Sequence, residues 1–113
     1  MLVGAVILTI VSIGMTVMII LCARGIIPRN SIAGLRLPAM FASDEAWMRG
    51  HRAGIGPTVI ASIVCIVMTV IGLIVPAFTG TFVVVIVALL AGLIVAAILG
   101  SRAASRVAPP ADR

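Results

Sequence analysis

Three long apolar stretches, with one extended polar segment between the first two, dominate the pattern of this chain. They cover residues 2–23, 55–75 and 77–99, and none of them contains Arg, Lys, Asp, Glu or His. A helix of about 20 residues is about 30 Å long, which matches the hydrocarbon core of a bilayer. We therefore predict an all-α fold with three transmembrane helices, which form a single membrane domain over residues 1–100.

The first stretch has the features of a retained transmembrane helix rather than those of a cleaved signal peptide. No basic residue precedes it, it is longer than the apolar part of a usual signal peptide, and Arg24 follows it as a stop-transfer charge. Gly25 suits a left-handed helix cap, and Pro28 prevents the helix from resuming. We expect the helix to end at this point.

Small and hydroxyl-bearing residues recur at helical spacing in all three stretches. Because lipid tails give helices no hydrophobic reason to associate, such residues mark the faces where membrane helices pack. We predict one close-packed bundle; a polar pathway is the alternative, although the stretches lack the ionisable residues typical of ion-coupled transporters. The small and hydroxyl-bearing residues are Ala5, Thr9, Ser12 and Thr16 in the first stretch, Thr58, Ser62, Cys65, Thr69, Gly72 and Pro76 in and just after the second, and Ala88, Gly92, Ala96 and Gly100 in and just after the third.

The second and third stretches are joined by a short connection, and the third is followed by a polar tail. Pro76 and Gly80 lie near this connection, so we expect an antiparallel helical hairpin. Residues 101–113 are poor in large apolar side chains, which predicts a disordered tail.

Composition and charge place the chain in a membrane and predict its orientation. The chain is 63% hydrophobic and 10% charged, whereas a soluble domain is nearer half apolar and a quarter charged. Its 8 basic residues are all arginines, and they lie either within residues 24–54 or after residue 101. By the positive-inside rule these two segments are cytoplasmic and the N-terminus is outside. Since topology accounts for the arginines, we expect no direct binding of nucleic acid.

The polar segment, residues 24–54, carries helix signals of its own. Ser43 suits an N-cap, two acidic residues follow it in the first turn, and Gly54 suits a helix end. Pro57 is suited to the first turn of the next helix. We predict a short cytoplasmic interfacial helix between the first and second transmembrane helices, with Trp47 as an anchor at the level of the lipid headgroups.

Binding is the chemistry that the polar segment favours. Arg36, Arg49 and Arg52 suit an anionic lipid headgroup or an acidic peptide, at about 1 kcal/mol for each exposed arginine. His51 is the only histidine and both cysteines lie in apolar stretches, so the sequence contains no pattern of a catalytic triad or of metal ligands. We expect neither enzymatic activity nor a bound cofactor or metal.

The same segment resembles the signature loop of the SdpI family. In that family an Asn, a Gly-x-Arg, an acidic residue, a Trp and an Asn or His with a following basic residue occur at this spacing. The match runs without a gap from Asn30 to Arg52. It consists of Asn30, Gly34, Arg36 and Pro38 in NSIAGLRLP, and of Glu45, Trp47, His51 and Arg52 in SDEAWMRGHR.

This resemblance implies a multi-pass protein of the bacterial cell membrane. The best-known member of the family is an immunity protein against a secreted toxic peptide, and it also signals by holding a transcriptional repressor at the membrane. The resemblance thus implies a toxic peptide or a cytoplasmic regulator as the partner, with the signature residues as the contact surface. Two alternatives stay open: a small oligomeric transporter or channel subunit, and a structural module that binds lipid headgroups.

Overall fold

The computed structural model describes residues 2–30, 34, 37–75, 77 and 79–107. This part of the chain contains three α-helices, α1 (Leu2–Ala23), α2 (Asp44–Ile74) and α3 (Thr81–Ser105), and one 3-10 helix, η1 (Pro38–Ala42). All three α-helices are long and apolar enough to cross a membrane. The prediction of an all-α protein with three transmembrane helices is therefore confirmed.

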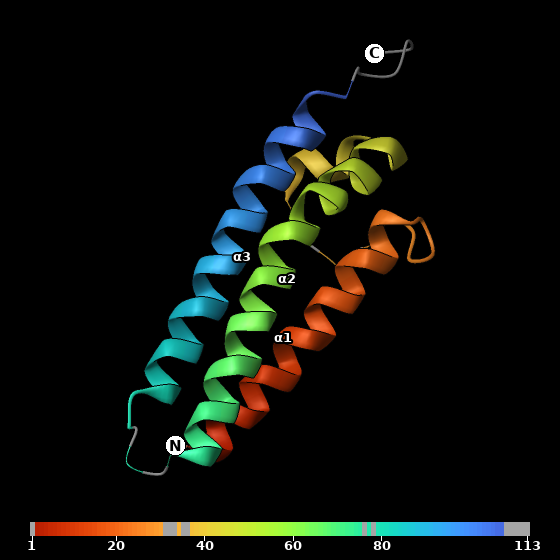
Figure 1. The fold of residues 1–113 in the computed structure, drawn as a ribbon. Helices are drawn as coiled ribbons and strands as arrows, with labels where there is room; N and C mark the ends of the chain where they lie inside the picture. The colour runs from red at the N-terminus through yellow and green to blue at the C-terminus, as the bar shows by residue number, and fades with distance from the viewer. Residues whose placement is uncertain (1, 31–33, 35–36, 76, 78, 108–113) are drawn as a thin grey trace.

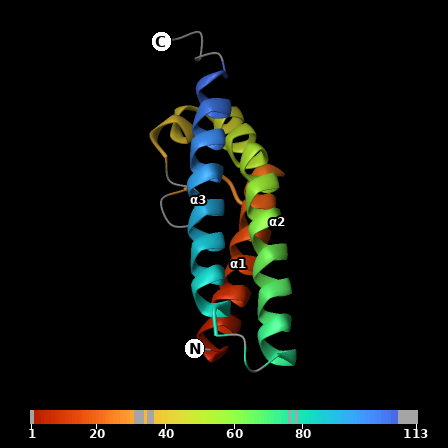
Figure 2. The ribbon, with the colours of Figure 1, turned by 60° about the vertical axis from the view of Figure 1, so that its left-hand side comes forward.

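The helices form an elongated bundle in which α1 and α3 pack mainly on α2 (Figure 1). The bundle measures 61 × 21 × 17 Å. Figures 1 and 2 show the N-terminus at the end where α2 connects to α3, whereas η1 and the last turns of α3 lie at the opposite end. Large apolar side chains such as Val3, Ile60 and Val83 are exposed on the sides of the bundle, as expected of a surface that faces lipid.

Hydroxyl groups join α1 to α2 along the predicted faces. Thr9 Oγ1 lies 2.9 Å from Thr69 Oγ1, and Ser12 Oγ lies 2.8 Å from Ser62 Oγ. Thr16 Oγ1 also contacts Ser62 Oγ, at 2.9 Å. We call these five residues the hydroxyl seam. Their burial confirms that the small and hydroxyl-bearing residues of α1 and α2 form the packed face.

Glycines set the contact between α2 and α3. A Cβ atom placed on Gly92 would lie 2.5 Å from Ala61 Cβ. A Cβ atom placed on Gly100 would lie 2.8 Å from the carbonyl oxygen of Gly50. Since real Cβ atoms do not approach other atoms so closely, these glycines allow the two backbones to touch, as the spacing of small residues in α3 predicts.

The end of α1 agrees with its sequence signals. Gly25 has a positive φ of 78°, which is the left-handed conformation expected of a helix cap. Its N–H donates to the carbonyl of Cys22 at 3.1 Å, and the N–H of Ile26 donates to that of Leu21 at 3.0 Å. These bonds satisfy carbonyls that the helix end would otherwise leave without donors.

The prediction of a separate interfacial helix is wrong, because α2 runs without interruption from Asp44 to Ile74. The predicted start is correct, since Ser43 Oγ accepts a hydrogen bond from the N–H of Ala46 at 3.0 Å. The predicted end at Gly54 does not occur. The segment expected to lie along the membrane surface forms the first turns of the second transmembrane helix, and Figure 1 shows these turns leaning away from the axis of the rest of α2.

Tertiary contacts explain why the helix passes through its two breaking signals. Gly54 is buried, so packing compensates for its low helix propensity. Pro57 cannot donate a hydrogen bond, which leaves a carbonyl one turn earlier without its usual partner and favours a bend. The carbonyl affected is that of Ala53; the hydroxyl of Thr58 bonds to the carbonyl of the next residue, Gly54, at 2.9 Å. Gly54 and Pro57 would separate two helices in an isolated peptide. In this protein they lie within one bent helix (Figure 1).

The expected disorder is also wrong for residues 101–105, because α3 continues to Ser105. Ala104 is buried in a cluster with Met40 of η1 and Ala46 of α2, so contacts with the polar segment stabilise the last turns. Residues 108–113 lie outside the described residues, and so does Pro76 in the connection between α2 and α3.

Candidate functional site

The polar segment folds back onto one end of the bundle. We use the term head for its described residues, which are 24–30, 34 and 37–54. The head includes η1 and the first turns of α2, and it packs against the last turns of α3 (Figures 1 and 2). The signature residues lie in this head, with the exception of Arg36, which falls outside the described residues.

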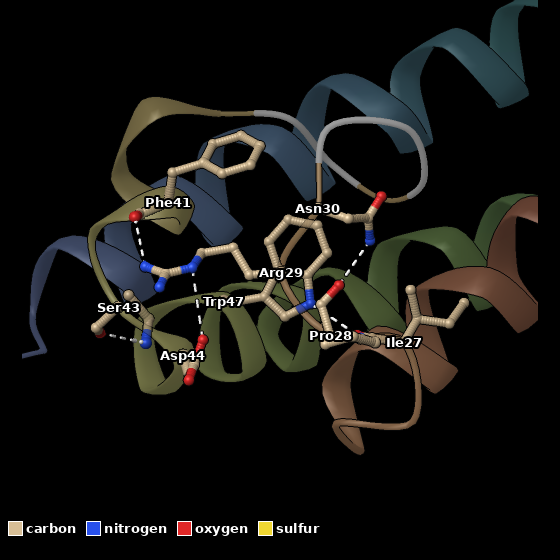
Figure 3. A network of polar contacts seen from close by, with 9 residues as sticks. Ile27, Pro28, Arg29, Asn30, Phe41, Ser43, Asp44 and Trp47 are labelled. Carbon is tan, nitrogen blue, oxygen red and sulfur yellow. Dashed lines mark hydrogen bonds and ion pairs between the residues drawn. The ribbon is translucent and has the colours of Figure 1, made fainter.

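Trp47 fastens the loop after α1 to the start of α2. Its side chain is only 1% exposed, and its Nε1–H donates to the carbonyl of Ile27 at 3.0 Å (Figure 3). Its ring lies 5.6 Å from that of Phe41 and 4.3 Å from that of His51, measured between centroids. The predicted role as an anchor among lipid headgroups is wrong for this conformation, because the indole is enclosed by the protein.

His51 lies one turn after Trp47 and is completely buried. Its Nδ1 is 2.7 Å from the carbonyl oxygen of Trp47, so Nδ1 carries the proton and donates it. His51 precedes the apolar stretch of α2, which begins at residue 55. Burial lowers the pKa of the imidazole, and the hydrogen bond to the Trp47 carbonyl opposes that shift. The neutral ring is thus a packing and hydrogen-bonding element of the head.

Gly34 contacts both aromatic residues and can only be glycine. Its φ is 96°, a conformation that side chains other than hydrogen disfavour. A Cβ atom at this position would lie 2.8 Å from His51 Nε2, and 3.0 Å from both Trp47 Cη2 and Cys22 Sγ. We call Gly34, Trp47 and His51 the signature cluster. Three residues of the predicted motif therefore meet at one point, next to the end of α1.

Arg29 closes the head on its outer side, although the sequence gives it no special role. Its Nη1 donates to the carbonyl of Phe41 at 2.8 Å, and its Nε lies 3.5 Å from the carboxylate of Asp44 (Figure 3). Asn30 donates from Nδ2 to the carbonyl of Pro28 at 2.6 Å. Asn30 thus shapes the loop, as expected of a turn-forming side chain.

Met40 is a second residue that sequence reasoning missed. It is fully buried, and its side chain occupies the space beside Gly50 of α2 and Gly100 of α3. The flexible thioether suits such an irregular gap between helices. Large apolar residues beside it, such as Leu37 and Phe41, were the available signal, but the sequence did not show that the segment returns to the bundle.

The remaining signature residues lie on the surface of the head. Pro38 is exposed at the start of η1, and Glu45 is exposed with its Oε1 3.0 Å from Arg49 Nη2. Arg52 is also exposed. With Arg49 and three residues nearby it lines a groove of about 400 Å³. We call this the arginine groove, and its lining comprises Arg49, Arg52 and Ala53 of α2 with Ala103 and Arg106 of α3.

The groups that the head exposes differ from those that it encloses. Within the part of the chain that the structure describes, no three side chains of His, Cys, Asp or Glu come together in the way that a metal ion requires. His51 is enclosed and its Nδ1 is engaged with a carbonyl. The chemistry that the head offers to its surroundings comes from its exposed arginines.

These features define a class of protein: a multi-pass helical membrane protein with a folded loop that closes one end of its bundle. A model of the SdpI/YfhL protein family matches residues 26–101, which is well over half of the chain. The chain belongs to the SdpI/YfhL protein family, as the signature residues predict. Comparison with curated proteins gives no match, and comparison with solved structures gives none either.

Proposed function

We propose that this protein acts as a toxin-peptide immunity protein or a signalling protein of the bacterial cell membrane, and that the head is its responsive part. The observation that carries the proposal is the signature cluster. Gly34, Trp47 and His51 join the loop to α2 beside the end of α1, so a change in the membrane helices is transmitted to the loop. The role is one of binding and conformational response, with no enzymatic step.

The signature residues divide into two roles in this proposal. The signature cluster positions the loop, because the side chains of Trp47 and His51 are enclosed by the protein and lie against Gly34. The other signature residues provide the contact surface for a toxic peptide or a cytoplasmic regulator, and Pro38, Glu45 and Arg52 among them are exposed. These contact residues are Asn30, Arg36, Pro38, Glu45 and Arg52.

The distribution of arginines supports a cytoplasmic head in this proposal. The described arginines follow α1, precede or begin α2, or end α3, and these helix ends lie together in Figure 1. By the positive-inside rule the head then faces the cytoplasm and the N-terminus faces outward. The described arginines are Arg24, Arg29, Arg49, Arg52, Arg102 and Arg106.

Deletion of the gene tests the proposal directly. We expect the deletion strain to become sensitive to a toxic peptide that is encoded nearby or secreted by neighbouring strains, and the full-length gene to restore resistance. Growth inhibition is the measurement. Unchanged sensitivity, together with unchanged expression of adjacent genes, would remove both the immunity and the signalling role.

A pair of glycine variants tests the role of the head. Gly34→Ala forces a Cβ atom to within 2.8 Å of His51 Nε2, so we expect it to displace the loop and abolish protection. Gly14→Ala is the matched control, since a Cβ atom there meets nothing within 4 Å. Immunoblots of the membrane fraction verify that both variants accumulate. Full protection by Gly34→Ala would contradict the role of the signature cluster.

A small oligomeric transporter or channel subunit is the second candidate, and the hydroxyl seam is the feature that suggests it. The seam hydroxyls are bonded to one another across α1 and α2. Such bonds stabilise helix packing by about 1 kcal/mol or less each. This engagement favours packing over a pathway for solutes, and for that reason we place the head proposal first.

A further inference from the structure

The outer side of the contact between α2 and α3 contains two hollows. One is the arginine groove at the head. The other has a volume of about 540 Å³ and an apolar lining, and we call it the apolar groove. Its walls include Gly56, Ile60 and Val64 of α2, and Ala91, Val95 and Leu99 of α3.

The two grooves follow one another along the same faces of the helices. On α2, Arg52, Gly56 and Ile60 are successive residues four apart, and residues four apart in a helix share a face. On α3, Ala103 of the arginine groove lies four residues after Leu99 of the apolar groove. A molecule in the apolar groove therefore has the arginines at the end that is nearer the head.

The arginine groove has an excess of positive charge. Arg49 is paired with Glu45. Arg52 and Arg106 are exposed, and neither forms an ion pair with another residue of the part of the chain that the structure describes. Arg52 lies three residues before the apolar stretch of α2, and hence at the depth of lipid headgroups. An anion at this place would neutralise two guanidinium groups without displacing an existing partner.

We propose that the arginine groove and the apolar groove between α2 and α3 together bind one anionic phospholipid. The phosphate lies among Arg49, Arg52 and Arg106, and an acyl chain extends along the apolar groove. Guanidinium groups donate two parallel hydrogen bonds to phosphate, which favours this headgroup chemistry. A free phosphate would leave the apolar groove unused, and a second copy of the chain would bring arginines of its own toward the same end. An anionic phospholipid matches both grooves.

Lipid binding to the purified full-length chain tests the headgroup part of the proposal. Native mass spectrometry with phosphatidylglycerol and phosphatidylcholine counts the lipids retained by each chain. We expect one phosphatidylglycerol, bound about 30-fold more tightly than phosphatidylcholine, as two exposed arginines at about 1 kcal/mol each would give. Arg52→Gln and Arg106→Gln should each weaken phosphatidylglycerol about fivefold. Arg24→Gln changes an exposed arginine at the same end outside the groove, and it should have no effect.

A substitution in the apolar groove tests the acyl-chain part. Ala91 is exposed on α3, so Ala91→Phe fills the groove without altering the buried face of the helix. We expect this change to weaken both lipids severalfold. Leu90→Phe places the same ring on a neighbouring exposed position outside the groove, and it should leave lipid binding unchanged.

Three results would overturn the proposal. The first is equal retention of the two lipids, and the second is an equal loss for Arg24→Gln and Arg52→Gln. The third is inorganic phosphate that competes as well as phosphatidylglycerol does, combined with no effect of Ala91→Phe, which would reduce the site to one for free anions. These measurements contain no toxin and no regulator, so their outcome is separate from that of the immunity or signalling proposal.

Discussion

At the scale of single residues, the signature cluster explains why a glycine, a tryptophan and a histidine occur together in one motif. Gly34 leaves space that the two rings occupy, and its positive φ turns the chain toward them. Trp47 Nε1–H donates a hydrogen bond to the carbonyl of Ile27, and His51 Nδ1–H donates one to the carbonyl of Trp47. The three residues fit together in one packed contact, and this contact explains why they occur together in the motif.

Burial of His51 predicts a dependence of stability on pH. Because the folded pKa is lowered from the ordinary value of about 6.5, the unfolded chain binds the proton more tightly than the folded chain does. The stability that the protein gains by burying a neutral His51 is fully present above about pH 6.5. It is lost as the pH falls toward the pKa of His51 in the folded protein. We expect the melting temperature in detergent to decrease over that range.

The measurement is thermal unfolding followed by the fluorescence of Trp47 between about pH 5 and pH 8. His51 is the only histidine, so the decrease belongs to one side chain. His51→Gln removes the titrating group and should flatten the profile. An unaltered profile in that variant would show that another group titrates.

Sequence reasoning found the signature residues but placed some of them in the wrong environment. The spacing of Trp47 and His51 shows that they share a helix face, yet it does not show whether that face is turned toward lipid, water or protein. Arg29 and Met40 were missed for a related reason. Their roles depend on the return of the loop to the bundle, which local patterns do not reveal.

At the scale of elements, the packed faces were predictable and one boundary was not. Small residues at every third or fourth position identify the contact faces, because close approach of membrane helices requires them. Gly54 and Pro57 are local signals for a helix boundary, but Gly54 is buried against neighbouring helices and α2 continues with Pro57 inside it. The separation of α2 into two helices was therefore wrong, while its start at Ser43 was right.

The crossing of α2 and α3 at Gly50 and Gly100 predicts a sharp effect of one added methyl group. Gly100→Ala should destabilise the protein by about 1–3 kcal/mol, because the new Cβ atom meets the backbone oxygen of Gly50 at 2.8 Å and the helices must separate. Gly14→Ala adds the same group in open space and should stabilise helix α1 by up to about 1 kcal/mol. Resistance to denaturation in mixed micelles measures both. Equal stability of the two variants would contradict a close crossing.

At the scale of the whole molecule, the three helices place the start of α1 and the end of α3 at opposite ends of the bundle (Figure 1). The N-terminus lies at one end of the bundle, and the last turns of α3 lie at the other end with the head (Figure 1). The arginines of the described residues lie at the head end, which is the distribution that the positive-inside rule uses. The fold class follows from apolar length alone, whereas orientation depends on these charges.

Reporter fusions test the orientation that this distribution predicts. A reporter fused after Arg113 should behave as cytoplasmic, and an alkaline phosphatase inserted after Thr79, in the connection between α2 and α3, should be active. Fluorescence and phosphatase activity in whole cells provide the measurements. A phosphatase that is active after Arg113 and silent after Thr79 would reverse the orientation.

The continuity of α2 has a mechanical consequence. A helix of 31 residues is about 46 Å long, about 15 Å more than the hydrocarbon core of a bilayer. Its first turns therefore form a lever outside the core, and a change of about 10° in the tilt of the helix moves the tip by about 3 Å. Helix tilt depends on the thickness of the bilayer. A peptide that thins the membrane would thus shift Trp47 and the loop attached to it without touching the head.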